Sequence, residues 1–280
     1  MPELPEVETV CRVMRRALGG KKIKEVEVVK DPIIFGSAPA EAVRQALLGR
    51  TVKTVGRKGK TWWIEFDEPP VLFGHLGMSG WIRELGQPSQ RLRESGNAPL
   101  DDENGRPRFL KLLITAEDGT QVCFTDARRL GRVWLGPSVE KDSKLKKLGP
   151  DAMNELPKGA AFKALFVKRH APIKGILLDQ TVLSGVGNWI ADEVLYQAKI
   201  APQRAASSLS DSELTKLRKT IAHVLETSVE AGADSDKYPA NWMFGNRWGG
   251  KRGAEKIGRH KIVRETVAGR TTAWVPAVQK

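Results

Sequence analysis

The chain has 280 residues, of which 40% are hydrophobic, which argues against a chain that is disordered through most of its length. Its 46 Lys and Arg residues against 33 Asp and Glu residues give a formal net charge of +13, which favours an anionic partner, nucleic acid before a membrane surface. Two distant cysteines, no long apolar run and an N-terminus unlike a secretory signal argue against a disulfide framework, a bilayer span and export. We therefore expect a soluble, intracellular protein.

The first expected element is a helix over residues 5–18. Pro5 suits a first helical turn, where its missing N–H has no partner to lose. Val7, Val10 and Met14 form an apolar stripe at helical spacing, and Gly19-Gly20 ends the pattern.

From about residue 20 to residue 135 the pattern is typical of β-strands. IKEVEVVK alternates between apolar and polar residues, and TVKTVGRKGKTWWIEF indicates two strands around a basic turn. Asp118-Gly119 predicts a hairpin turn, and the polar stretch 87–108, rich in Gly and Pro, predicts a surface loop. Together these features predict a β-sandwich or barrel.

The rest of the chain changes character twice. A charged linker over residues 136–156 leads to helical periodicity over residues 157–236, where Ser210 and Glu213 are spaced as a capping box. Residues 237–280 are again β-like and carry ten Lys and Arg against two acids. This end is a solvated basic tail or a small folded module that faces nucleic acid. Its aromatic residues favour the folded module, because disordered tails are usually poor in them.

The N-terminus is a candidate reactive site. If Met1 is removed, as is usual before a small residue, Pro2 has a free secondary amine that can attack an aldehyde-like carbon and form an iminium. Glu3 beside it can act as an acid or base, and Glu6 lies about one helical turn further on. The alternative, that Pro2 and Glu3 merely begin a helix, is favoured by these residues alone.

A second candidate is the turn Gly185-Val186-Gly187-Asn188, which opens into a helix. Such a turn presents backbone N–H groups and the positive end of the helix dipole to a phosphate. Asn188 can cap the helix or donate to that phosphate. A plain turn between helices is the alternative, and by itself this motif favours it.

Four motifs in this order, PELPEVET, HLGMSG, TDARRLG and LLDQTVLSGVGNWIADEVLYQA, resemble the formamidopyrimidine-DNA glycosylase/endonuclease VIII family. The likeness covers essentially the whole chain and is strongest to the zincless-finger plant and fungal branch. It implies an α+β multidomain fold with an N-terminal catalytic β-sandwich and N-terminal helix over residues 1–135. A helix-two-turns-helix DNA-binding domain over residues 157–236 and a C-terminal β-hairpin zincless finger over residues 237–280 would follow the linker.

The resemblance also implies an activity, that of a bifunctional DNA glycosylase and AP lyase of base excision repair. By likeness, Pro2 is the nucleophile that forms a Schiff base, Glu3 is the acid or base, Glu6 supports the site, and Lys60 is the catalytic lysine that contacts DNA. Strand cleavage would follow by β- and δ-elimination.

Several DNA contacts are implied in the same way. Met78 and the loop Arg128-Arg129-Leu130 would fill the gap left when the damaged base is flipped out. Leucine stands here where the family has a phenylalanine wedge. For Met78 the alternative without the family is a buried gap-filler.

In the C-terminal half, Lys174 would lie near the lesion and a phosphate, Asn188 would bind a phosphate, and Arg270 of the finger would contact phosphates flanking the lesion. Bacterial relatives usually carry a four-cysteine zinc finger, but residues 237–280 contain no cysteine, and a zinc site needs four ligands. We therefore expect no zinc and no other cofactor. Packing by Trp242, Trp248 or Trp274 is our hypothesis for what replaces the metal.

Two alternatives to the enzyme remain at this point. A non-enzymatic binder of abasic or distorted DNA would share the fold, and a ribosomal or topoisomerase-like protein would share the helical element but not the first six residues. We expect a DNA-associated monomer acting on damaged double-stranded DNA, in the nucleus of a eukaryote or the cytoplasm and nucleoid of a bacterium. Residues 234–261 do not resemble the bacterial 8-oxoguanine capping loop, so ring-opened purines and hydantoins are the expected lesions.

Overall fold

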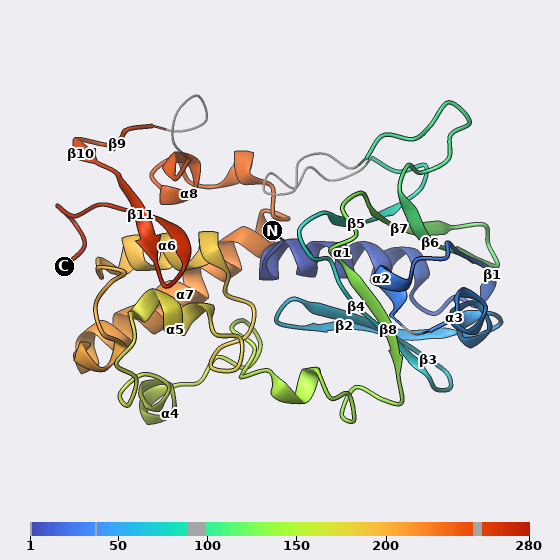
Figure 1. Ribbon diagram of the computed structural model, residues 1–280, viewed down its shortest axis with the longest axis horizontal. Coiled ribbons are helices and arrows are strands. Elements are labelled where there is room, and N and C mark those ends of the chain that lie inside the picture. The colour runs from blue at the N-terminus through green and yellow to red at the C-terminus, as the bar shows by residue number, and fades with distance from the viewer. Residues whose placement is uncertain (1, 37, 89–98, 249–253) are drawn as a thin grey trace. The chain divides into compact units, whose positions relative to one another are not determined.

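The computed structural model describes residues 2–36, 38–88, 99–248 and 254–280 (Figure 1). The chain divides into two compact units, Met1–Lys147 with Gly232–Asp234, and Leu148–Ala231 with Ser235–Lys280. The main division therefore lies inside the stretch 136–156 that the sequence presents as a linker.

The first unit is a β-sandwich of two four-stranded antiparallel sheets, with strand orders β1-β6-β7-β5 and β2-β3-β4-β8. Its strands are β1 (Ile23–Val28), β2 (Val52–Lys58), β3 (Thr61–Phe66), β4 (Val71–His75), β5 (Gly80–Glu84), β6 (Leu110–Ala116), β7 (Gln121–Asp126) and β8 (Arg132–Gly136). Its helices are α1 (Leu4–Leu18), α2 (Pro32–Phe35) and α3 (Ala40–Leu47).

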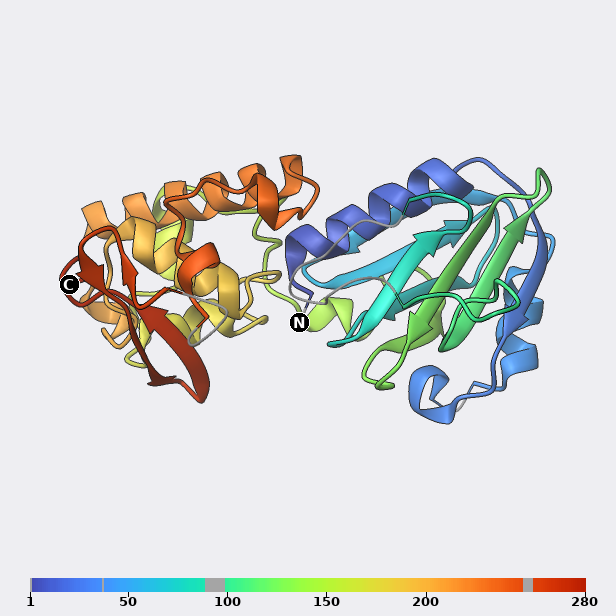
Figure 2. The same ribbon diagram turned by 90° about the horizontal axis from the view of Figure 1, so that it is seen from above.

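Helix α1 contacts β2 and β3 of one sheet and β5 and β7 of the other, and it runs lengthwise along the sandwich (Figure 2). Its buried stripe includes Val7, Val10 and Met14, as the periodicity predicts. The hairpin between β6 and β7 is also confirmed, and Gly119 has the positive φ of 85° that its turn requires. Of the predicted loop 87–108, residues 89–98 lie outside the described residues.

The second unit combines a helical group with two short hairpins. Its helices are α4 (Gly159–Ala164), α5 (Ile173–Leu178), α6 (Asn188–Ala198), α7 (Asp211–Glu230) and α8 (Met243–Asn246). Its strands are β9 (Lys256–Ile257) paired with β10 (His260–Lys261), and β11 (Val263–Val267) paired with β12 (Arg270–Trp274). Helix α6 is central, because it contacts α5, α7, α8 and β12 (Figure 1).

The predicted capping box of α7 is confirmed. Ser210 Oγ accepts a bond from the Glu213 backbone N–H at 3.3 Å, and Glu213 Oε2 accepts one from the Ser210 N–H at 2.8 Å. Among the described residues, no helix is both long and apolar enough to cross a membrane.

Candidate functional site

The start of α1 holds the first group of predicted site residues. Pro2, Glu3 and Glu6 are all buried. The Glu3 backbone N–H donates to Glu6 Oε2 at 3.0 Å, which forms one half of a capping box at the N-cap of α1. Two carboxylates thus lie at the N-terminal end of α1, one at the N-cap and one in the first turn, where the positive end of the helix dipole favours negative charge.

Polar contacts with β2 fix the position of α1 along the sandwich. Arg15 Nε donates to the Val55 carbonyl at 2.7 Å, and Arg57 Nε donates to Glu8 Oε2 at 2.9 Å. Burial alone would raise the pKa of Glu8, but the hydrogen bond from Arg15 and the charges around it hold that pKa below its usual value. Moving toward the N-terminus of α1 therefore corresponds to moving toward the C-terminus of β2.

This register brings Pro2 and Lys60 to the same end of the sandwich. Pro2 precedes Glu8 by six residues, about 9 Å of helix, and Lys60 follows Arg57 by three residues, about 10 Å of strand. Lys60 lies in the tight turn between β2 and β3, where Gly59 has a φ of 57°. The Lys60 side chain is buried in the fold.

Strand pairing brings the predicted DNA-contacting loops to this end as well. The strand residue after Lys60 pairs with His75 at the end of β4, and His75 pairs with Arg132 at the start of β8. Met78 follows β4 and Leu130 precedes β8. The sheet order therefore explains how three segments far apart in sequence meet at one edge.

His75 fixes the turn that carries Met78. Its Nδ1 accepts a hydrogen bond from the Gly77 backbone N–H at 2.9 Å, so the ring is neutral at this nitrogen. Burial, and after it the positive charges of Lys60, Arg132 and Lys144, lowers the pKa of His75 to about 4. The imidazole therefore stays neutral at neutral pH, and its Nδ1 keeps accepting the hydrogen bond from Gly77.

The two predicted wedge residues are exposed and their loops are in contact. Met78 is 45% exposed and Leu130 is 43% exposed. Between them Gly77 has a φ of 62°, and a Cβ at that position would lie 2.3 Å from the Leu130 carbonyl oxygen. The approach of the two loops therefore requires glycine.

Asp126, which is completely buried, connects the same two loops. Its Oδ1 accepts from the backbone N–H groups of Arg128 at 3.2 Å and Arg129 at 3.1 Å, and also from the Ser79 hydroxyl. Its Oδ2 accepts from the Gly131 N–H at 2.7 Å. One carboxylate therefore sets the shape of the Arg128-Arg129-Leu130 loop.

The two arginines of this loop differ. Arg129 donates from Nε and Nη2 to Asp31, each at 2.9 Å in its shortest contact, and Lys111 Nζ also donates to Asp31 at 2.9 Å. Burial raises the pKa of Asp31, but hydrogen bonds from Arg129 and Lys111 outweigh it and hold the pKa far below its usual value. Arg129 thus anchors the loop, while Arg128 is exposed beside Leu130.

In the second unit, Lys174, which the resemblance predicts to lie near the lesion and a phosphate, is buried inside the fold. Its side chain is 0% exposed, and its Nζ donates to Asp192 Oδ1 and Thr272 Oγ1, both at 2.6 Å, and to the Thr271 carbonyl at 3.2 Å. Asp192 also accepts from Arg247 Nη2 at 2.8 Å. In this position the ammonium, on α5, binds side-chain and backbone oxygens of α6 and β12, and it is not exposed to solvent. The sequence contains no local signal for such a long-range ion pair.

Asn188 is the first residue of α6, directly after the Gly187 N-cap, as the predicted turn requires. Gly185 in the same turn has a φ of 105°. The Asn188 Nδ2 donates to the Thr271 carbonyl of β12 at 3.1 Å. The helix start is therefore joined to the finger hairpin.

Arg270 lies at the tip of that hairpin and is exposed. It pairs with Val267 across the two-residue turn Ala268-Gly269, whose φ values of 50° and 71° are those of a hairpin turn. A rigid two-stranded support therefore presents this guanidinium.

The residues of the finger do not fit a zinc ion. The chain has no cysteine after Cys123, and the described residues contain no group of three or more His, Cys, Asp or Glu placed to hold a metal. An apolar cluster occupies the finger instead, formed by Met243, Ile257, Ile262, Ala273 and Val275.

The three tryptophans of our packing hypothesis have different environments. Trp242 is buried in an aromatic group, with its ring 5.2 Å from that of Tyr238. Trp248 is 37% exposed, and Trp274 donates from Nε1 to Glu265 at 2.6 Å. None of the three belongs to the apolar cluster of the finger.

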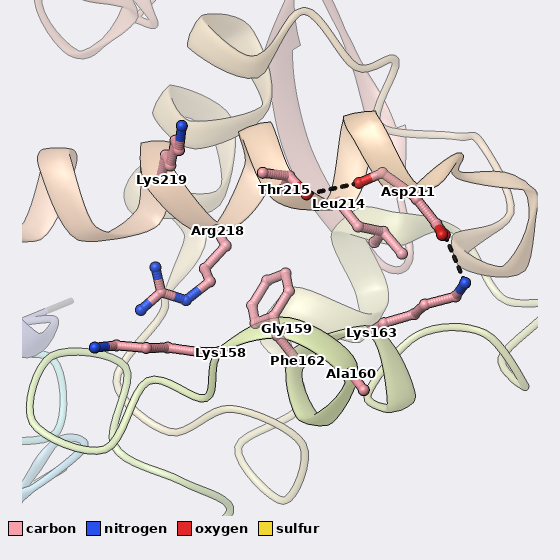
Figure 3. A pocket seen from close by; sticks show the side chains of 10 residues that line it. All are labelled: Lys158, Gly159, Ala160, Phe162, Lys163, Asp211, Leu214, Thr215, Arg218 and Lys219. Carbon is pink, nitrogen blue, oxygen red and sulfur yellow. Dashed lines mark hydrogen bonds and ion pairs between the residues drawn. The ribbon is translucent and has the colours of Figure 1, made fainter.

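A pocket of about 520 Å³ lies between α4 and α7, away from the predicted site residues of this unit (Figure 3). Phe162 and Leu214 form its apolar part, and Lys163 pairs with Asp211 at 2.6 Å across it. Its remaining polar rim is basic, with Lys158, Arg218 and Lys219, and Arg218 Nε donates to the Pro157 carbonyl at 2.6 Å.

Two family models match the chain. The formamidopyrimidine-DNA glycosylase N-terminal domain matches residues 1–133, and the formamidopyrimidine-DNA glycosylase H2TH domain matches residues 148–239. The two models together cover most of the chain.

Individual proteins agree with these matches. A formamidopyrimidine-DNA glycosylase of Arabidopsis thaliana is 41% identical over 281 residues, which cover 100% of this chain and 71% of that protein. One of Pelotomaculum thermopropionicum is 32% identical over 290 residues, covering 100% and 99%. A crystal structure of the Lactococcus lactis enzyme Fpg in complex with DNA containing an oxidised pyrimidine has a TM-score of 0.80 at 26% identity, with 100% of both chains covered.

Proposed function

Since the chain belongs to the formamidopyrimidine-DNA glycosylase family, we propose that it is a bifunctional DNA glycosylase and AP lyase that removes oxidised bases from double-stranded DNA. The observation that carries the proposal is the start of α1, where Pro2 precedes two buried carboxylates joined by the Glu3 N–H bond to Glu6 at 3.0 Å. A helix start that serves only the fold has no need of two buried acids directly after an N-terminal secondary amine.

The proposed chemistry begins with the Pro2 amine once Met1, which lies outside the described residues, is removed. An α-amino group has a reference pKa of about 8, so a useful fraction is unprotonated near neutral pH. The Pro2 nitrogen attacks C1′ of the damaged nucleoside, the C1′–N bond to the base breaks, and the base leaves with a proton. The Pro2 nitrogen loses its own proton, and its lone pair then expels O4′: the C1′–O4′ bond breaks, O4′ takes up a proton, the sugar ring opens and a C1′ iminium forms. Glu3 is the acid or base for these proton transfers.

The resulting iminium withdraws electrons from the sugar. A base removes the proton on C2′ and the C3′–O bond breaks, and a second elimination then breaks the C5′–O bond. Lys60, at the same end of the sandwich, is the proposed cation at the lesion phosphate, and Glu6 holds the Glu3 backbone in place.

The proposed DNA contacts follow from exposure. Met78 and Leu130 are the wedges that fill the stack after base flipping, and Arg128 beside them enters the same gap. Asn188 and Arg270 bind backbone phosphates. We propose that the protein acts as a monomer and without zinc or another cofactor.

Borohydride trapping on an abasic-site duplex tests the proposal. The processed wild-type protein should give a covalent complex, Pro2→Gly should give none, and Pro5→Gly, the same change three residues along the buried helix start, should still give it. Mass spectrometry of the N-terminus first establishes that Met1 is absent. A wild-type protein that binds the duplex but is never trapped would instead be a non-enzymatic binder of abasic DNA.

Lesion choice is tested separately with a cleavage panel of 8-oxoguanine, formamidopyrimidine, guanidinohydantoin and thymine glycol duplexes. We propose that formamidopyrimidine and hydantoin are cut faster than 8-oxoguanine. Equal or faster cutting of 8-oxoguanine would contradict this preference while leaving the chemistry untouched.

A further inference from the structure

The finger of the second unit has one cation whose surroundings are unusual. Arg264 of β11 donates from Nε to the Arg247 carbonyl at 3.0 Å. Its Nη2 lies 2.9 Å from the carbonyl oxygen of Asn246, 3.0 Å from that of Trp248 and 2.8 Å from that of Ala254. A single guanidinium therefore bonds to four backbone carbonyls.

These carbonyls belong to two separate backbone segments. Asn246 ends α8, and the next two residues continue from its C-terminus, where helix carbonyls have no intrahelical partner and a cation is favoured. Ala254 belongs to the segment before β9. The planar guanidinium, with five N–H donors in a fixed arrangement, suits several acceptors at once, whereas an ammonium is a compact point charge.

The same side chain is linked to the support of Arg270. Arg264 pairs with Ala273 across the hairpin, three strand residues, about 10 Å, before the turn that presents Arg270. The Ala273 N–H in turn donates to Asp192 Oδ2 at 3.3 Å, and Asp192 binds Arg247. The base of the hairpin is therefore held by α8 on one strand and by α6 on the other.

We propose that Arg264 is a positioning residue that takes the organising role of a metal in this finger, its guanidinium holding the hairpin at the orientation in which Arg270 reaches DNA. A zinc ion would gather separate backbone segments through side-chain ligands. Here the cation is part of the chain and gathers them through their carbonyl oxygens. The inference rests on the proposed function, since Arg270 is a phosphate contact only in that function.

The test compares Arg264→Ala, Arg264→Lys and Lys261→Met in single-turnover cleavage of a lesion duplex. Lys261→Met removes the same charge from an exposed position of the finger and sets the electrostatic baseline. Arg264→Ala should raise the half-saturating protein concentration about tenfold beyond that baseline, with the rate at saturation unchanged. Arg264→Lys should restore little, because its ammonium cannot bond to all four carbonyls.

A double mutant and chemical rescue separate positioning from loss of charge. Arg264→Ala combined with Arg270→Gln should bind more weakly than Arg270→Gln alone by no more than the Lys261→Met baseline, because the effect of Arg264 on the position of Arg270 is already lost. Millimolar guanidinium chloride should tighten binding by Arg264→Ala, while the same concentration of sodium chloride should weaken it. The guanidinium is far below denaturing concentration.

Three results would overturn the proposal: an Arg264→Ala half-saturation equal to that of Lys261→Met, full additivity with Arg270→Gln, or restoration by Arg264→Lys. If Arg264→Ala does not fold, Arg264→Lys replaces it in the comparison with Lys261→Met and in the double mutant with Arg270→Gln. Borohydride trapping of the wild type distinguishes the failures. If the wild type is trapped but the Arg264 variants bind as their controls do, only the positioning role is refuted. If the wild type is not trapped, the proposed function is refuted.

Discussion

The two units hold their proposed DNA-contacting segments with buried or half-buried side chains of opposite charge. In the first unit buried acids do so: Asp126 accepts bonds from the backbone of the 128–131 loop, and Asp31 accepts the Arg129 guanidinium. In the second unit cations do so: the buried Lys174 and the half-buried Arg264 donate to oxygens of the finger. The acid centres fit a loop whose free groups are N–H donors, and the cation centres fit segments whose free groups are carbonyls.

The difference shows how a polyanion-binding protein can carry many acids. Asp31 is 5% exposed and Asp126 is 0% exposed, so neither carboxylate faces a phosphate. Their charges are used inside the fold to orient a loop that displays an arginine and a leucine. Burying these two carboxylates removes their negative charge from the surface of a chain whose net charge is +13, which favours the binding of a polyanion.

The largest effect should come from breaking the ion-pair centre of the second unit. Asp192→Ala leaves Lys174 and Arg247 buried without their carboxylate, and should lower the free energy of unfolding by about 3–5 kcal/mol. Urea unfolding followed by tryptophan fluorescence measures it. The matched control Asp211→Ala removes an acid that is 75% exposed in its pair with Lys163 and should cost no more than about 1 kcal/mol. Equal losses in the two variants would refute this account.

In the first unit the corresponding change is Asp126→Asn. An amide NH₂ in place of Oδ2 would face the Gly131 N–H, now 2.7 Å away, and leave that donor unpaired at a cost of about 1–3 kcal/mol. Lesion cleavage should weaken with it, because the wedge loop loses its shape. Asp118→Asn, on an exposed turn of the same sandwich, is the control for urea unfolding and cleavage. A variant indistinguishable from that control would show that the acid does not set the loop.

A smaller, pH-dependent effect should come from His75. The pKa of His75 is about 4 in the fold, below the value of about 6.5 for an exposed histidine, so the unfolded chain binds the extra proton between these pH values. The free energy of unfolding should therefore fall as the pH falls from about 6.5 to 4, by about 2 kcal/mol at pH 5.

The variant His75→Asn keeps an acceptor for the Gly77 N–H but does not titrate. The wild type should lose about 2 kcal/mol of unfolding free energy between pH 7 and pH 5, and the variant should not lose it. The stability of the variant relative to the wild type should therefore rise by that amount. His170→Asn, a change of an exposed histidine in the other unit, serves as the control. A constant difference across this pH range would mean that His75 is not held neutral by the fold.

The smallest effect on stability should come from the wedge itself. Leu130→Ala removes a side chain that is 43% exposed and should change the unfolding free energy by no more than about 0.5 kcal/mol. Binding of a duplex with a stable abasic analogue should nevertheless weaken about threefold to tenfold relative to undamaged duplex. Leu100→Ala, at a leucine that is 78% exposed, should leave that ratio unchanged. If the ratio of abasic to undamaged binding is also unchanged in Leu130→Ala, Leu130 does not act as a wedge.

Local signals were enough for much of the fold. The apolar stripe of α1, the capping box at Ser210 and the turn at Asp118-Gly119 each depend on residues within a few positions of one another. Such patterns can be read from one sequence because their physics is local. The position of Pro2 and the glycine turn before Asn188 were predicted for the same reason.

The supports of the site depend on distant partners and were missed. Asp31 and Arg129 are 98 residues apart, and Lys174 and Thr272 are also 98 residues apart. A lysine in a motif looks the same whether it meets a phosphate or a buried carboxylate, so the pairing of Lys174 with Asp192 cannot be predicted from its motif. Arg264 could not be distinguished from the other basic residues of its segment, because its partners are backbone carbonyls that every sequence has.

Gly77 has a consequence for how such enzymes can vary. A Cβ at Gly77 would lie 2.3 Å from the Leu130 carbonyl oxygen. The backbones of the Met78 and Leu130 loops are therefore in direct contact, and neither can change its path without the other. If one of the two loops became longer or bulkier, the backbone of the other loop would have to move away from it. A change of the side chain at position 130, our proposed wedge, avoids this constraint, because that side chain is exposed and its replacement leaves the backbone contact as it was. New lesion preferences should therefore arise by exchanging the tips of these loops rather than their lengths.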